Sequence, residues 1–419
     1  MNQRPSHSLA LDLLAQYDPI PDSPVQAPDA LLSLVYTSGS TGKPKGAMLS
    51  VERYAWSCEK LVEAVSLTAA DRGFSYLPLA HITERVYIYG GSLFSGATIA
   101  FPESLDTFIE DVKRCRPTVF ISVPRLWAMF RIKIHEKLPQ KKLALLLKIP
   151  LVSSLIKSKL QKGLGLDQAR VLGCGSAPVA PALLEWYHSI GIEITEAWGM
   201  TENHAYSTLN YPFRADKIGT VGKAGPGVTL KISDEGEILC RCDGMMLGYY
   251  KEPELTRDAF TADGWLHTGD KGALDVEGNL RITGRVKDLF KTSKGKYVAP
   301  APIEDKLVMH PAVEACCVTG ANLGQPLAVL MLNEGAVAKA KTAEGKAELE
   351  AGLAEHLKTV NATLDPHEQM DCLVLVTEPW SVDNGFITPT FKVKRNRVEE
   401  VYAGSYERWV GLRKKVIWL

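Results

Sequence analysis

The chain has 419 residues, a length that predicts about two or three domains. Hydrophobic residues make up 46% of it and charged residues 23%, which is typical of a globular protein and excludes a disordered one. Lysine plus arginine and aspartate plus glutamate both number 48, so the overall charge gives no reason to expect a nucleic-acid partner.

The eight cysteines show neither Cys-x-x-Cys spacing nor a His/Cys cluster at zinc spacing. Free thiols in a reducing cytosol are therefore expected. The first ten residues lack the basic and apolar pattern of a signal peptide, and no apolar run approaches the roughly 20 residues that span a bilayer. These features predict a cytoplasmic protein.

The first part of the chain predicts a parallel α/β sheet. Residues 1–30 are polar and proline-rich and indicate a leader or linker. A buried strand at 31–36 then meets a glycine-rich loop, which we expect to lead into a helix. Apolar strands alternate with helical stretches from there, with strands at 120–123, 169–172 and 192–195 and helices at 125–136 and 180–189.

The pattern changes after about residue 218. Segments 236–242 and 272–282 indicate short strands and hairpins, the second with a turn at 277–279. A small α+β unit follows from residue 286, with helices at 303–309 and 344–364 and strands at 315–318, 327–332 and 372–377. The predicted organisation is a leader (1–30), an α/β core with a small β-rich subdomain (31–285) and a C-terminal domain (286–419).

The most informative motif is the glycine-rich run at residues 36–46, Tyr-Thr-Ser-Gly-Ser-Thr-Gly-Lys-Pro-Lys-Gly. Glycines let the backbone approach an anion, while amides and hydroxyls donate to its oxygens and lysines neutralise its charge. It differs from the ordinary P-loop because no Ser or Thr follows the lysine. The alternative is a flexible linker, which rarely follows an apolar strand in this way.

Residues 37–46 resemble the signature phosphate loop of adenylate-forming (AMP-binding) enzymes, among them acyl-CoA synthetases, luciferases and peptide-synthetase adenylation domains. Further runs resemble the family's other signatures, in the family's order, at 76–85, 173–178, 196–202, 265–270, 282–288 and 388–395. The resemblance covers the chain from about residue 31 onward. It implies a large adenylation domain, a small mobile C-terminal domain, and ATP, Mg²⁺ and CoA as ligands.

The resemblance also implies which residues bind the nucleotide. They are Thr37, Ser38, Gly39, Ser40, Thr41, Gly42, Lys43, Lys45, Gly175, Ser176, Ala177, Trp198, Gly199, Met200, Thr201, Asp270, Arg285 and Lys392. Within this set Trp198 would lie against adenine, and Asp270 would accept hydrogen bonds from the ribose hydroxyls. Glu202 and the Thr41 hydroxyl would hold Mg²⁺ between the carboxylate and the triphosphate. Taken singly, Glu202 could be a surface acid, Trp198 a core residue and Asp270 a turn cap.

Lys392 is the residue expected to assist the first half-reaction, because an ammonium group lowers the repulsion between a carboxylate and the α-phosphate. Phe391 stands where many members have glycine, so Lys394 is an open alternative. The family places His81 near the substrate carboxylate and the CoA thiol; a structural histidine is the alternative. Lys287 stands at the family's hinge, about which the small domain would swing to present the 294–297 loop for acyl transfer to CoA.

The expected substrate is a long-chain fatty acid. Residues 122–127 resemble the gate of long-chain acyl-CoA synthetases, with Trp127 as the candidate acyl gate, although ordinary helix packing would also explain it. Residues 291–300 look like the same branch. Segment 138–164 is apolar with interspersed lysines, which suits either an interfacial helix at a membrane or a helix pair packed on the core.

One departure from the family concerns the start of the chain. Relatives have a long segment before the phosphate loop, whereas here the loop begins at residue 37. We therefore expect a fragment, a partner that supplies the rest, or a natural truncation, with exposed apolar surface and oligomerisation as consequences. The alternatives to an active ligase are a nucleotide- or acyl-binding remnant without turnover and an adenylating enzyme for another carboxylic acid.

Overall fold

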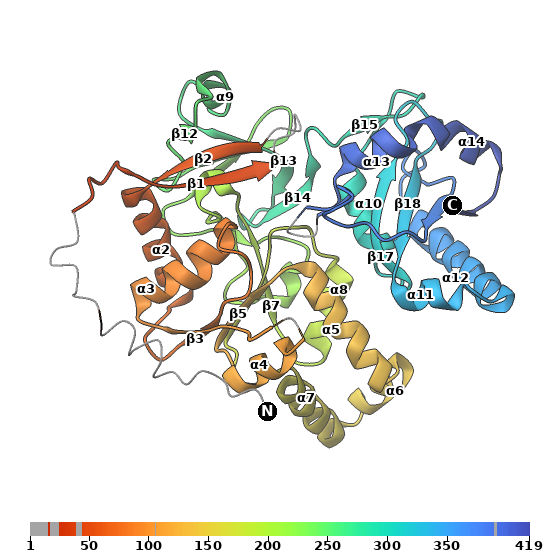
Figure 1. The fold of residues 1–419 in the computed structure, drawn as a ribbon, viewed down its shortest axis with the longest axis horizontal. Helices are drawn as coiled ribbons and strands as arrows, with labels where there is room; N and C mark the ends of the chain where they lie inside the picture. Colours follow the sequence, from red (N-terminus) through yellow and green to blue (C-terminus); the bar gives the residue numbers. More distant parts are fainter. Residues whose placement is uncertain (1–15, 17–24, 39–43, 105, 389–391) are drawn as a thin grey trace.

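The computed structural model describes residues 16, 25–38, 44–104, 106–388 and 392–419. A large α/β body and a smaller α/β body lie side by side, and β14 leads from the first into the second (Figure 1). The predicted fold class is confirmed. The position of the domain boundary, at residue 286, stays a prediction.

The large domain is built on a seven-stranded sheet of order β4-β3-β5-β6-β7-β8-β9. Its first five strands are parallel to one another, whereas β8 pairs antiparallel with both β7 and β9. The strands are β3 (Arg72–Phe74), β4 (Thr98–Ala100), β5 (Val119–Ser122), β6 (Val171–Cys174), β7 (Ile194–Trp198), β8 (Thr208–Leu209) and β9 (Lys223–Ala224). The strands predicted at 120–123, 169–172 and 192–195 are thus β5, β6 and β7.

Helices cover both faces of this sheet, because successive strand residues point to opposite sides. Phe120 packs into a core with helices α4 (Phe108–Cys115), α5 (Pro124–Lys137), α6 (Gln140–Leu147), α7 (Pro150–Leu164) and α8 (Pro181–Ser189). Its neighbour Val119 packs into another core, with helix α2 (Val51–Val65) and the π-helix η1 (Glu84–Gly90). A short helix, α3 (Gly91–Ser95), continues η1.

The expected strand–loop–helix arrangement around the glycine-rich run is wrong. Strand β1 (Leu31–Ser38) pairs antiparallel with a second strand, β2 (Pro44–Ser50), which in turn pairs with β12 (Gly248–Tyr249). The segment after the loop alternates with the two-residue period of a strand and buries Ala47 and Leu49. Helix α2 begins only at Val51, after the N-cap Ser50.

A four-stranded antiparallel sheet forms the β-rich subdomain, in the order β10-β11-β13-β14. Its strands are β10 (Thr229–Ile232), β11 (Glu237–Arg241), β13 (Leu266–Leu274) and β14 (Leu280–Arg285), and α9 (Pro253–Asp258) lies in the connection before β13. The predicted hairpin with its turn at 277–279 is β13–β14. Gly278 adopts a φ of 85°, a left-handed conformation that favours glycine.

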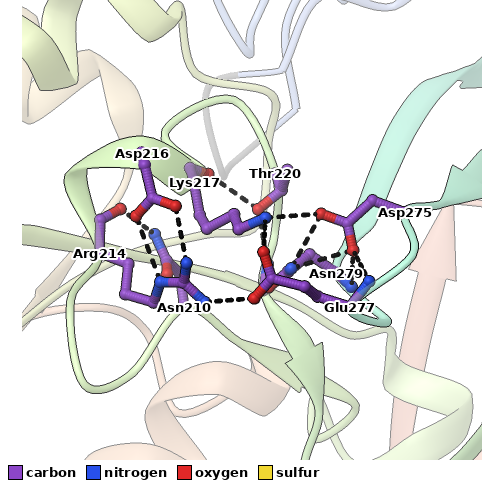
Figure 2. Close-up of polar contacts among 9 residues, drawn as sticks. Asn210, Arg214, Asp216, Lys217, Thr220, Asp275, Glu277 and Asn279 are labelled. Carbon is purple, nitrogen blue, oxygen red and sulfur yellow. Dashed lines mark hydrogen bonds and ion pairs between the residues drawn. The ribbon is translucent and has the colours of Figure 1, made fainter.

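An ion-pair network fixes the turn of this hairpin (Figure 2). Lys217 Nζ lies 2.9 Å from Asp275 Oδ2 and 2.5 Å from Glu277 Oε1. Arg214 Nη1 lies 2.6 Å from Glu277 Oε2. Exposed ion pairs contribute little singly, but these share partners and tie the turn to the 3₁₀ helix η3 (Ala215–Lys217).

The C-terminal domain is a three-layer unit. Its sheet has the order β17-β18-β19-β20, and β18 alternates between two cores: Ala328 and Leu330 point to one, Val329 and Met331 to the other. Helices α10 (Pro300–Leu307), α11 (Glu334–Lys339) and α12 (Ala343–Asn361) cover the first face, and α13 (Arg395–Tyr402) and α14 (Tyr406–Gly411) the second. The strands are β17 (Val313–Thr319), β18 (Leu327–Leu332), β19 (Leu373–Val376) and β20 (Val416–Trp418), and a small ribbon, β15 (Phe290–Lys291) with β16 (Tyr297–Val298), precedes them.

The two domains touch through α5 and β7 on one side and α10 and β17 on the other. Arg125 of α5 forms an ion pair with Glu314 of β17. Glu196 of β7 is buried near Asp305 of α10, and desolvation, with a smaller contribution from Asp305, raises the pKa of the Glu196 carboxyl to about 8. The domain interface therefore holds a carboxyl group that resists ionisation.

All eight cysteines carry free thiols, as predicted. Within the described residues, no helix combines the length and apolar character needed to cross a bilayer.

Candidate functional site

The site begins where the parallel strands end. Because β6 and β7 run in the same direction, the residues that follow them meet at one edge of the sheet. These residues are Gly175, Ser176 and Ala177 after β6, and Gly199, Met200 and Thr201 after β7. Ser176 has a left-handed φ of 68°, and its Oγ lies 3.2 Å from the Oγ1 of Thr83, which precedes η1. The structure thus brings three of the predicted motifs together.

An apolar cavity opens at this edge, between the sheet and the layer formed by α2 and η1. Thr83, Ser176, Trp198 and Gly199 line one part of it. The remaining lining residues are mostly aliphatic or lack a side chain: Leu61, Val65, Leu67, Tyr87, Val119, Ile121, Val171, Gly173, Cys174, Gly175, Thr195, Ala197, Ala205 and Leu209. Such walls suit an apolar part of a ligand.

Trp198, Asp270 and Arg285 form one connected unit. The Trp198 Nε1–H donates to Asp270 Oδ2 at 2.8 Å, and the Arg285 Nε–H donates to Asp270 Oδ1 at 2.8 Å. Asp270 and Arg285 are cross-strand partners on β13 and β14. The residues predicted to contact adenine and ribose are therefore neighbours, although 87 positions separate the first from the last in sequence.

Close backbone packing explains why the turn after β7 contains Gly199. A Cβ on Gly199 would lie 2.3 Å from the carbonyl carbon of Ala205, so no larger residue fits without a backbone shift. The Ala205 N–H donates to the Met200 carbonyl at 2.8 Å, and the Asn203 side chain accepts from the Met200 N–H at 2.9 Å. These bonds hold the backbone that presents Glu202.

Glu202 is buried and has a partner that the sequence did not reveal. The Tyr249 hydroxyl donates to Glu202 Oε1 at 2.7 Å, and Lys45 Nζ donates to the Tyr249 hydroxyl at 3.0 Å. Desolvation lowers the pKa of Lys45, as do Lys287 and Arg285, while Glu202 opposes the shift. Tyr249 stands in an ordinary Gly-Tyr-Tyr run, so only the pairing of β12 with β2 brings it to the site.

Several predicted residues of the phosphate loop, namely Gly39, Ser40, Thr41, Gly42 and Lys43, lie outside the described residues. Thr37 and Ser38 end β1, and their strand pairs with Lys45 and Pro44 of β2.

The chemistry of Glu202 fits a magnesium ion. One oxygen is engaged by Tyr249, and the other accepts no hydrogen bond from the described residues. Within the described part of the chain, no group of three or more His, Cys, Asp or Glu side chains could hold a metal. Mg²⁺ commonly binds through one or two carboxylates together with substrate phosphates and water, so a single carboxylate is an adequate protein ligand.

Lys392 reaches this site from the C-terminal domain. By accessible surface the residue is exposed, but protein atoms surround its ammonium group, and this desolvation lowers the pKa of Lys392 to about 8; Arg285 adds to the shift and Asp270 opposes it. Burial lowers the pKa of His81 to about 4, and Lys392 contributes to that shift. Lys392 therefore lies within electrostatic reach of Asp270, Arg285 and His81. Lys394, in contrast, is the N-cap of α13.

The other predicted residues lie as follows. Lys287 is in the turn after β14, where the chain passes into the C-terminal domain. Trp127 is fully buried on α5, where its Nε1–H donates to the Gly173 carbonyl at 3.3 Å and its ring packs edge-on against Phe120 and Tyr187. It does not line the cavity described above.

These motifs, on this fold, define an adenylate-forming protein. Residues 3–250 match the AMP-binding enzyme family, and residues 287–408 match the family of AMP-binding enzyme C-terminal domains. The chain belongs to the AMP-binding enzyme family, in its acyl-CoA ligase group.

Similar proteins with curated names are fatty-acid–CoA ligases. A putative fatty-acid–CoA ligase, fadD11 of Mycobacterium tuberculosis, is 31% identical over 91% of this chain and 73% of its own length. The long-chain-fatty-acid–CoA ligase FadD15 of Mycobacterium bovis is 30% identical over 90% of this chain and 68% of its own length. For long-chain-fatty-acid–CoA ligase 6 of Rattus norvegicus the identity is 31%, over 91% of this chain and 61% of the relative.

Solved structures with a similar fold include enzymes with a wider range of names. The adenylation domain of a carboxylate reductase from Mycobacterium chelonae has a TM-score of 0.77 and 27% identity, covering 96% of this chain and 63% of that domain. ATP-bound MatB from Rhodopseudomonas palustris has a TM-score of 0.68 and 27% identity, covering 91% of this chain and 70% of its own. The chain thus spans about two thirds of the proteins that it resembles.

Proposed function

We propose that the protein is an ATP-dependent fatty acid–CoA ligase. It would join a carboxylic acid to AMP with release of pyrophosphate, and then transfer the acyl group to CoA. The observation that carries this proposal is the convergence of Lys392 with Asp270, Arg285 and His81 beside the apolar cavity, because these groups come from two domains and from four separate motifs.

In the first half-reaction a carboxylate oxygen attacks the α-phosphorus, and the bond from that phosphorus to the bridging oxygen of pyrophosphate breaks. The ammonium group of Lys392 would stabilise the negative charge that gathers between the two anions. Asp270 would accept from the ribose hydroxyls while Trp198 and Arg285 hold its carboxylate in place. A magnesium ion on Glu202 and Thr41 would neutralise the phosphate oxygens.

In the second half-reaction the CoA sulfur attacks the acyl carbonyl carbon, the bond to the AMP oxygen breaks and the thiol proton is released. His81 would contribute as a neutral ring: its Nδ1 accepts the Thr83 N–H at 3.3 Å, which assigns the ring proton to Nε2. That N–H can donate to a substrate oxygen. Rotation about Lys287 would exchange Lys392 for the 294–297 loop, which joins β15 and β16.

A long-chain fatty acid is the substrate that we favour. The naming of the relatives as fatty-acid–CoA ligases supports it. The cavity, with a volume of about 40 Å³, has aliphatic walls that suit part of an acyl chain. The role of Trp127 as an acyl gate stays a prediction, since its side chain packs in the core. The likeness to carboxylate reductase and to MatB keeps another carboxylic acid as the second candidate. A cytoplasmic location stays a prediction from cysteine usage.

The test is to incubate the chain with ATP, magnesium and acids from acetate to oleate, with and without CoA, and to follow AMP and acyl-CoA by mass spectrometry. We expect acyl-CoA to form best from long-chain acids and to be lost in Lys392→Ala, with Lys394→Ala as the matched control. ATP binding without AMP formation from any acid would favour the remnant without turnover. AMP formation from short or aromatic acids alone would favour the second candidate.

A further inference from the structure

The helical hairpin α6–α7 stands out from the large domain at the end of the molecule opposite the β-rich subdomain (Figure 1). Helix α6 ends at Leu147 and α7 begins at Pro150, so Lys148 and Ile149 form the connection between them. The site described above uses none of these residues.

The inner face of the hairpin is firmly attached to the domain. Leu143 is 2% exposed, and Leu147, Ile156 and Leu160 pack against the same core. The Gln161 side chain donates to the Gly191 carbonyl at 2.6 Å. The hairpin is therefore an ordered part of the fold, and its packing determines which of its side chains point away from the domain.

The outer face carries large apolar side chains. Leu145 is 64% exposed, Ile149 48%, Leu151 83% and Leu155 72%, all within eleven positions around the connection. Single exposed apolar residues are common, but a cluster of this kind marks an interaction surface.

The hairpin is also strongly basic. Residues 138–164 contain no Asp or Glu and six lysines: Lys141, Lys142, Lys148, Lys157, Lys159 and Lys162. Five of these are exposed, and Lys157 is half-buried. None of the six forms an ion pair with an acid in the described part of the chain, so their charge is not neutralised internally.

We propose that this face binds the surface of an anionic lipid bilayer. Leu145, Ile149, Leu151 and Leu155 would enter the boundary between headgroups and acyl chains, while the flanking lysines would remain among the anionic headgroups. A protein partner is the less suitable occupant, because lysine is depleted in the cores of protein interfaces and enriched on the polar side of interfacial helices. The proposal does not depend on which acid the enzyme activates.

The experiment is flotation of the full chain with vesicles of phosphatidylcholine alone or of equal parts phosphatidylcholine and phosphatidylglycerol. We expect binding to the anionic vesicles that weakens as salt is raised. A charge variant, Lys159→Glu with Lys162→Glu, should lower partition by at least about 25-fold, since each lysine near an anionic surface contributes about fivefold. An apolar variant, Leu151→Ser with Leu155→Ser, should lose binding at every salt concentration.

A control variant carries one substitution of each kind on the exposed surface of the C-terminal domain, Leu412→Ser with Lys414→Glu, and should float like the parent protein. Circular dichroism checks that each variant is folded. If the parent protein floats with neither vesicle, the proposal is wrong and the face is left to a protein partner. Equal flotation of the hairpin variants and the parent would also overturn it.

Discussion

The pH dependence of the first half-reaction follows from the position of Lys392. Only the protonated side chain can stabilise negative charge between the carboxylate and the α-phosphate. Its pKa is about 8, lowered by the surrounding protein and by Arg285, so the proton is lost as the pH rises through 8. At pH 9 about one tenth of the molecules keep it, and we expect the adenylation rate to fall roughly tenfold below its plateau.

The assay is pyrophosphate release from ATP and a fixed acid without CoA, so that ionisation of the CoA thiol does not contribute. His81 has a pKa of about 4 and stays neutral over this range, so it adds no inflection. Lys392→Arg keeps its charge well above pH 9, so its profile should lose this inflection, whatever its absolute rate. Lys394→Arg, the control, should follow the parent protein. A flat parent profile between about pH 7 and 9, or an equal fall in Lys392→Arg, would refute the assigned role.

Three further predictions concern neighbouring groups. Tyr249→Phe removes the hydrogen bond to Glu202 and should slow pyrophosphate release about tenfold or more at limiting magnesium; an unchanged magnesium dependence would contradict this. Gly199→Ala forces a Cβ against the Ala205 carbonyl and should reduce the same rate by about 100-fold in a folded protein, whereas full activity would show that the turn can adapt. Glu196 keeps its proton up to about pH 8 when folded but only to about 4.5 when unfolded, so its contribution to stability should fall with rising pH between these values, by at most about 1.4 kcal/mol per unit. Glu196→Gln should remove this contribution in urea unfolding, while Asp305 and Glu84, whose carboxyl pKa values burial raises to about 7, keep theirs; parallel curves for variant and parent would argue against it.

The sequence predicted the elements whose signal is local. The helix predicted at 125–136 is α5, which begins with Pro124 at its first turn, and the strand predicted at 327–332 is β18. Every residue of β18 is buried, because both faces of its sheet are covered. A continuous apolar run between turn residues identifies such a strand without knowledge of its neighbours.

The errors and omissions have a common cause, which is dependence on distant parts of the chain. The segment after the phosphate loop forms β2 because β1 and β12 pair with it, and a short alternation at 44–50 is too weak a signal alone. Tyr249 reaches Glu202 only through that pairing. The π-helix η1 packs tightly on α2: a Cβ on Gly90 would lie 2.3 Å from the Cys58 sulfur. No pattern of neighbouring residues in the sequence predicts a contact of this kind.

The ion-pair network at the β13–β14 turn has a mechanical consequence. The chain enters the C-terminal domain from the end of β14, so the proposed rotation of that domain would pull along β14 and load its hydrogen bonds to β13 in shear. At the opposite end of the same hairpin, Lys217 and Arg214 form ion pairs with Asp275 and Glu277 of the turn (Figure 2). The hairpin is thus held at the end away from the C-terminal domain, and this would keep Asp270 and Arg285 in register during the domain rotation proposed above.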